Sequence, residues 1–148
     1  MKIGQPNSYK SILNNLNINY IRNDNLIDFN LNNKYKISSF KVIHGELKNC
    51  YGYTFNNIIS FTGDTSYCES IKNISKRTKY LVADSTMQKG DINHMGVDNI
   101  KDLAKNKDLN IITTHMSVNS EKLLEKTLFR NNNVELAKDG KIFYIKTD

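Results

Sequence analysis

The chain has few of the residues that build disulfide frameworks, cysteine metal sites or membrane spans. Among its 148 residues are two cysteines, Cys50 and Cys68, and they lack the CxxC spacing of a metal site. We therefore expect two free thiols in a cytoplasmic protein rather than one disulfide. No apolar stretch approaches the roughly 18 residues of a membrane span, and no basic-then-apolar leader opens the chain. A soluble protein without a membrane partner is expected.

Runs of one charge sign are also missing. Lys and Arg number 21 against 15 acidic residues, which gives a net charge of +6 without any block of consecutive basic residues. Scattered, solvated lysines explain such a charge, and an anionic partner such as RNA or a phosphate ester is the alternative. Because aromatic and basic residues are not interleaved, an RNA-binding module is the least supported function.

Histidine is scarce as well, and its placement is informative. There are three histidines. His44 ends the apolar run 40–43, His115 ends the apolar run 111–114, and Asp64 closely follows a third apolar run. Each lies where a strand would stop and a loop begin, so the sheet would fix the side chain while the loop gives access. Imidazoles and a carboxylate together are ligands that zinc, iron or manganese accepts.

Each of these residues also has a purely structural interpretation. His44 and His115 could be hydrogen-bonded core histidines. Asp64 could be the N-cap of a helix over residues 66–77, and His94 could cap or flank the helix that follows it. The residues alone leave these alternatives open.

The hydrophobic pattern divides the chain into a β-rich first half and an alternating second half. Period-2 runs predict strands and i, i+3, i+4 spacing predicts helices. Asn56-Asn57 separates two strand runs and is a good two-residue hairpin signal. The pattern implies one layered α+β domain, with a mixed sheet and helices on one face. The expected helices are 8–16, 66–77, 97–106 and 120–130; the expected strands are weak ones within 17–34, then 35–43, 51–55, 58–61, 80–83, 111–112 and 141–145.

Short motifs follow one another in a recognisable order. They are Val-Ile-His-Gly at 42–45 with Tyr-Gly-Tyr at 51–53, Phe-Thr-Gly-Asp-Thr at 61–65, Ala-Asp-Ser-Thr at 83–86, His-Met-Gly at 94–96, Thr-His-Met-Ser at 114–117 and Leu-Ala-Lys-Asp-Gly at 136–140. In this order and spacing they resemble the metallo-β-lactamase-fold superfamily of metallohydrolases. The branch nearest in pattern contains ribonuclease Z and its bacterial relatives.

The resemblance implies a role for each site residue. His44 would bind a first metal, Asp64 would bridge two metals, and His115 would bind the second. Asp64 and His94 would be the catalytic residues, with His94 as proton donor. The cofactor would be zinc, or else manganese or iron, and the reaction would be hydrolysis of a phosphodiester or related ester. A carboxylate that holds two cations together allows a shared water to lose a proton near neutral pH.

One departure from the family pattern changes the expected activity. The superfamily's principal metal motif, His-x-His-x-Asp-His, is missing, and residues 1–16 resemble the segment that follows it. Residues 1–148 are therefore expected to form one partial domain, the C-terminal half of an αββα sandwich, with one sheet face apolar and exposed. As a truncated or split half it would be inactive alone, and it would need an N-terminal-half polypeptide or a homo-oligomer. The alternative is a non-catalytic remnant without metal that associates with itself or binds a partner.

Overall fold

The computed structural model describes residues 28–31, 35–128 and 131–146. The helix expected over residues 8–16 lies outside these ranges, as do residues 17–27 of the region expected to hold weak strands. For residues 28–31 and 35, only the backbone is described.

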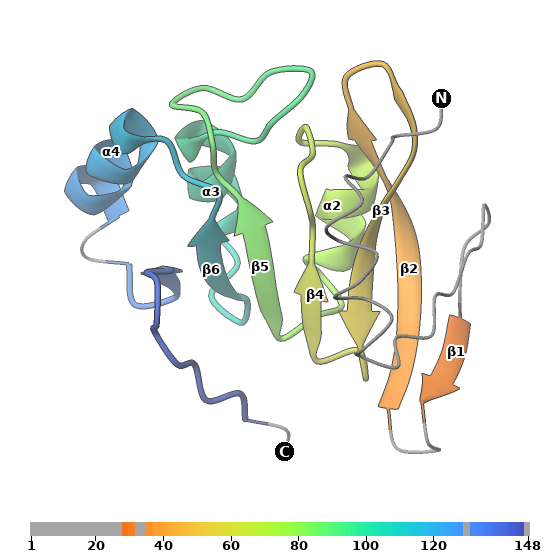
Figure 1. Cartoon of the computed structure of the whole chain (residues 1–148). Coiled ribbons are helices and arrows are strands. Elements are labelled where there is room, and N and C mark those ends of the chain that lie inside the picture. Colours follow the sequence, from red (N-terminus) through yellow and green to blue (C-terminus); the bar gives the residue numbers. More distant parts are fainter. Residues whose placement is uncertain (1–27, 32–34, 129–130, 147–148) are drawn as a thin grey trace, which may run out of the picture.

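Seven strands form one mixed sheet in which the spatial order follows the chain order (Figure 1). The pairs from β1 to β4 are antiparallel and the pairs from β4 to β7 are parallel. This confirms the mixed sheet expected from the sequence. The strands are β1 (Asp28–Leu31), β2 (Tyr35–His44), β3 (Leu47–Phe55), β4 (Ile59–Phe61), β5 (Tyr80–Asp84), β6 (Asn110–Thr114) and β7 (Val134–Leu136).

The described helices cover one face of this sheet (Figure 1). They are α2 (Glu69–Ile74), α3 (Val97–Leu103) and α4 (Val118–Leu128), and each follows a strand and leads to the next parallel one. A parallel neighbour needs such a crossover connection. The apolar side chains between helices and sheet form a single core. Its fully buried members include Ile71, Leu81, Met95, Val97, Ile100, Leu109, Ile111 and Leu124.

A hairpin turn at Asn56-Asn57 is confirmed, but the connection between β3 and β4 has three residues, 56–58, instead of the predicted two. Asn56 and Asn57 have positive φ, 52° and 57°, and Phe55 pairs directly with Ile59 across the turn. Asparagine tolerates this left-handed conformation better than most residues. A type I′ turn of this kind suits the twist of the flanking strands.

Several predicted boundaries were wrong. Residues 141–145 do not form a strand, and β7 at Val134–Leu136 lies at the sheet edge instead. The apolar side chains of Ile142 and Tyr144 are 73% and 87% exposed. A short run of such residues is typical of a strand, but a strand also needs a neighbouring strand for its backbone hydrogen bonds. The helix predicted over 66–77 is shorter and begins after its N-cap Cys68, so Asp64 is not its cap.

The sheet face opposite the helices carries partly exposed aromatic side chains. Tyr53 and Phe61 are direct partners across β3 and β4, and each is 40% exposed. The Phe61 ring contacts that of Phe55 edge to face, with centroids 5.8 Å apart. Tyr53 and Phe61 therefore leave a small, partly exposed aromatic area on this face.

Two expectations about the chain's setting can be compared with the described residues. Cys50 and Cys68 are both free thiols. In the part of the chain that the structure describes, no helix has the length and apolar character to cross a membrane.

Candidate metal centre

Four strands bring their carboxyl ends to the same edge of the sheet. β2 and β4 are both antiparallel to β3, and β5 and β6 run parallel to β4, so all four point the same way. His44 and Asp84 are the last residues of β2 and β5, while Asp64 and His115 follow β4 and β6 closely. Ligand sites in open α/β sheets typically form outside the carboxyl ends of strands.

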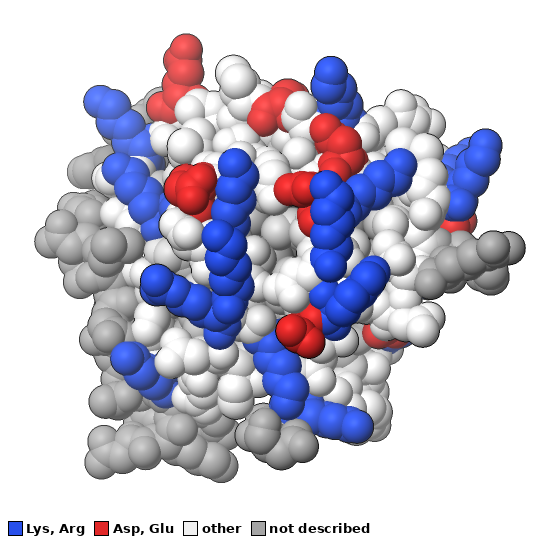
Figure 2. All heavy atoms as spheres, turned by 180° about the vertical axis from the view of Figure 1, so that it is seen from behind, with Lys and Arg blue, Asp and Glu red and all other residues white. Residues whose placement is uncertain are grey.

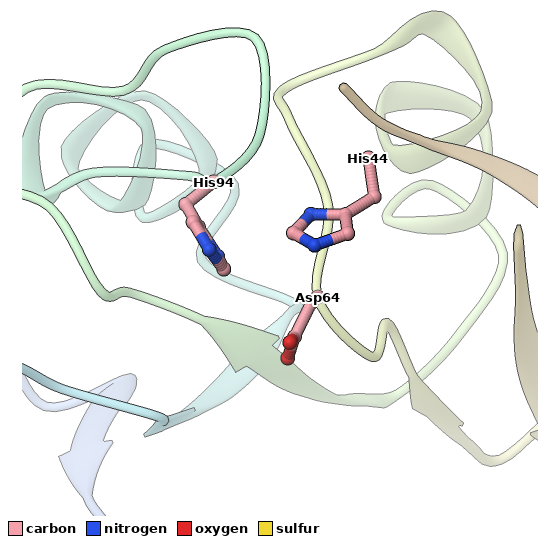
Figure 3. Close-up of side chains that lie close together, drawn as sticks. All are labelled: His44, Asp64 and His94. Carbon is pink, nitrogen blue, oxygen red and sulfur yellow. The ribbon is translucent and has the colours of Figure 1, made fainter. Parts of the chain in front are cut away.

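The side chains at this edge converge. The ligand atoms of His44, Asp64 and His94 lie within 4.8 Å of one another, and Figure 3 shows the three side chains pointing into one space. Asp84, His94 and His115 form a second such group. The groups are connected by the His94 side chain and by Asp64, whose Oδ1 lies 2.9 Å from His115 Nδ1. The structure thus brings together His44, Asp64, His94 and His115.

Hydrogen bonds fix the orientation of two of the imidazoles. His44 Nδ1 lies 2.8 Å from the carbonyl oxygen of Asn93, and His94 Nδ1 lies 2.8 Å from Asp84 Oδ2. A carbonyl or carboxylate oxygen can only accept, so Nδ1 carries the proton in both neutral rings. Nε2 then keeps its lone pair, and among the described residues it has no hydrogen-bond partner. Metal-binding histidines are commonly held in this way through their other nitrogen.

Sequence reasoning did not assign a role to Asp84, which is the most buried charged group of the site. Its side chain is 1% exposed. It accepts hydrogen bonds from the backbone N–H groups of Thr65 and Thr86, from the Thr86 hydroxyl and from the His94 ring. A buried carboxylate needs such partners to offset its desolvation. The available signal was its position as the last residue of a buried strand.

Two residues at the site adopt the left-handed backbone conformation. Gly63 has φ of 60°, a conformation that glycine adopts without steric cost, and it forms the turn before Asp64. His115 has φ of 54°, which is uncommon for a residue with a side chain. The Thr86 hydroxyl, whose single proton is donated to Asp84, also lies 2.8 Å from the His115 carbonyl oxygen. Such local strain is typical of functional sites.

The alternatives to a functional site can now be compared with burial. The His115 and Asp64 side chains are 51% and 50% exposed, so neither is a core residue. His44 is only partly buried, and its hydrogen-bond partner belongs to a loop rather than to the core. His94 precedes α3 without capping it, because the N-cap is Gly96.

The donor set is compatible with a divalent cation. It combines imidazole nitrogens with carboxylate oxygens, which suits zinc, manganese or iron. Two ligands on opposite sides of one zinc ion lie at most about 4.2 Å apart. The separations within each group are no larger than 4.8 Å, so small side-chain movements would satisfy this limit. The half-exposed Asp64 and His115 leave one side of the group open to solvent.

Comparisons with known proteins identify the fold but not the family. No protein-family model matches the chain, and no curated protein matches it in sequence. A diphosphatase of the PhnP family has a TM-score of 0.63 at 23% identity over 82% of this chain and 48% of its own. The metallo-β-lactamase-fold protein YhfI of Bacillus subtilis has 0.61 at 20% identity over 82% and 53%. An isothiocyanate hydrolase from Delia radicum gut bacteria has 0.61 at 12% identity over 97% and 67%.

These similarities show that the chain has the fold of metallo-β-lactamase-type proteins. At such low identities they say nothing further about its chemistry. The chain spans about half the length of the diphosphatase and of YhfI, 48% and 53% respectively.

Proposed function

We propose that this chain supplies one half of the active site of a cytoplasmic, metal-dependent hydrolase that cleaves a phosphodiester or related ester. The observation that carries the proposal is the convergence of three histidines and two carboxylates at one sheet edge. The motif order adds support for a ribonuclease Z-like branch. The fold neighbours include a diphosphatase and an isothiocyanate hydrolase, which is consistent with hydrolysis.

His44, Asp64 and His115 are the residues that would hold the metal, and Asp64 would be shared between two ions. His44 offers Nε2, because its Nδ1 proton is donated to Asn93. Asp64 lies within ligand distance of His44 on one side and of His115 on the other. Zinc is the favoured ion, with manganese or iron as alternatives. When bound, such ions supply Lewis acidity and a nucleophile at neutral pH.

His94 is the proposed proton donor, and Asp84 orients it. The Asp84 carboxylate accepts the Nδ1 proton of His94, so the ring presents Nε2 toward the space between His44 and His115. When the ring is doubly protonated, the second proton is on Nε2 and would be positioned for transfer to a leaving-group oxygen. The Thr86 hydroxyl, which donates to Asp84, fixes that carboxylate in turn.

The described ligands do not complete a two-metal site, so the proposal includes a partner. A polypeptide carrying His-x-His-x-Asp-His, or a second copy of this chain, would supply the remaining groups. RNA remains a weaker candidate partner, because Figure 2 shows basic and acidic side chains interspersed on the helix-covered side. Two lysines of this side pair with neighbouring acids, Lys72 with Glu69 and Lys105 with Asp102.

Calorimetric titration with zinc and manganese, together with a phosphodiesterase assay, tests the proposal. We expect weak zinc binding that is lost in Asp64→Ala and retained in the control Asp108→Ala, an exposed acid remote from the sheet edge. Hydrolysis of a chromogenic phosphodiester should be undetectable for the chain alone. It should appear with a polypeptide that carries His-x-His-x-Asp-His, and Asp64→Ala should abolish it. Absence of zinc binding would refute the metal site, and rapid turnover by the chain alone would refute the need for a partner.

The second candidate function is a non-catalytic remnant that associates with itself or with another protein. It is favoured by the exposed aromatic pair Tyr53 and Phe61 on the face opposite the helices. In that case light scattering should show dimers or larger species that Phe61→Ser dissociates, and the zinc titration should be featureless. Dimers that bind zinc and lose it in Asp64→Ala would instead support the hydrolase.

A further inference from the structure

The loop between β5 and α3 carries His94 and is organised around one exposed carboxylate. Asp91 Oδ1 accepts the backbone N–H groups of both Asn93 and His94, each at 2.8 Å. The Asp91 N–H donates to the His94 carbonyl at 2.9 Å. Residues 91–94 therefore form a closed turn whose shape depends on the Asp91 side chain.

The base of this loop is fastened to α3 independently of Asp91. Gly90 N–H donates to Asp98 Oδ1 at 2.9 Å, and Gly96 N–H donates to Asn99 Oδ1 at 3.0 Å. Met87 and Gly96 form a β-bridge that closes the loop. Removal of the Asp91 carboxylate should therefore release the tip of the loop without detaching its base.

The tip of the loop contacts the turn between β2 and β3 at two points. Gly45 N–H donates to the Ile92 carbonyl at 2.9 Å, and His44 Nδ1 donates to the Asn93 carbonyl at 2.8 Å. The second bond decides which nitrogen of His44 carries the proton, since the carbonyl can only accept. The tautomer of His44 is thus set by a loop that lies 49 positions further along the chain.

We propose that Asp91 is a positioning residue: its carboxylate holds the Asn93 carbonyl against His44, and it holds the His94 backbone so that the His94 ring meets Asp84. Both imidazoles then present Nε2 to the site. The relevance of this arrangement to metal binding rests on the proposed function, whereas its effect on the histidine tautomer does not.

The experiment compares the wild-type chain with Asp91→Ala, Asp91→Asn and the control Asp108→Ala. Long-range proton–nitrogen NMR spectra at about pH 8.5, where an ordinary imidazole is neutral, report which nitrogen carries the proton. His44 should be protonated on Nδ1 in the wild type and in Asp108→Ala. Asp91→Asn should behave in the same way, because an amide oxygen also accepts the two N–H groups. Asp91→Ala should show a mixture of both tautomers, together with shifted amide signals for Asn93 and His94.

Zinc titration adds a second measurement. Loss of a residue that orients a metal-binding histidine typically weakens the affinity by about 10–100-fold, so we expect Asp91→Ala to raise the zinc Kd roughly tenfold and Asp91→Asn to restore it. If no variant binds zinc but the His44 tautomer still responds to Asp91→Ala, the proposed function fails and this inference holds. Protonation of wild-type His44 on Nε2, or an Asp91→Ala tautomer identical to wild type, would overturn it. If Asp91→Ala does not fold, loss of the Nδ1 proton in folded Asp91→Asn would overturn it equally.

Discussion

Replacement of Asp84 by alanine should destabilise the fold strongly, because this carboxylate is both buried and fully hydrogen-bonded. Its side chain is 1% exposed and accepts four hydrogen bonds. Two of the donors are the backbone N–H groups of Thr65 and Thr86, which cannot turn elsewhere. A buried donor without an acceptor costs about 1–3 kcal/mol. We expect Asp84→Ala to lose about 3 kcal/mol of unfolding free energy.

Urea denaturation followed by circular dichroism measures this loss. With a urea dependence of about 1–3 kcal/mol per molar for a small domain, the midpoint should fall by about 1–3 M. Asp84→Asn keeps the size and one acceptor oxygen, so it should lose less than the alanine variant. Asp108→Ala, at an exposed position, should stay within about 0.5 kcal/mol of wild type. If Asp84→Ala loses no more unfolding free energy than Asp108→Ala, the hydrogen bonds to Asp84 contribute little to stability.

Two further predictions concern the hairpin and the tyrosine before α2. Asn57→Val should cost about 1–2 kcal/mol in urea denaturation, because φ is 57° there, while Asn57→Gly should be nearly neutral; equal losses would contradict the turn geometry. Burial and the hydrogen bond to Asp102 raise the pKa of Tyr67 above its ordinary 10.0. Its contribution to stability is therefore full below pH 10.0 and is lost as the pH rises above that value. Between about pH 8 and about pH 11, wild type should lose more stability than Tyr67→Phe, and equal losses would refute this effect.

The sequence was most informative where a local rule determines the structure. Asparagine at positive φ identified the hairpin at Asn56-Asn57, and apolar runs identified β2, β5 and β6. His44, Asp64 and His115 could be placed at one edge because strands of the same direction end together. These predictions required only periodicity and the geometry of sheets.

The sequence was least informative where a structure depends on a distant partner. Residues 141–145 alternate like a strand, but they are mostly exposed and have no strand hydrogen bonds in the described structure, whereas β7 pairs with β6. The shared role of Asp84 and His94 required knowledge that the loop after β5 turns back over the strand end. The hydrogen bond from His44 is accepted by the backbone carbonyl of Asn93. Every residue type has this carbonyl, so the side chain at position 93 could not be used to predict the bond.

Two histidines of this site are held in place by groups of the protein itself, and this bears on how an incomplete ligand set would behave. His44 is fixed by the Asn93 carbonyl and His94 by Asp84, while His115 contacts Asp64, another proposed ligand. A cation that meets ligands already in position does not bear the conformational entropy cost of ordering them. In the proposed half site, the weak binding that we expect would therefore come from missing ligands rather than from disordered ones. A partner that adds only the missing donors should accordingly restore binding without refolding this chain.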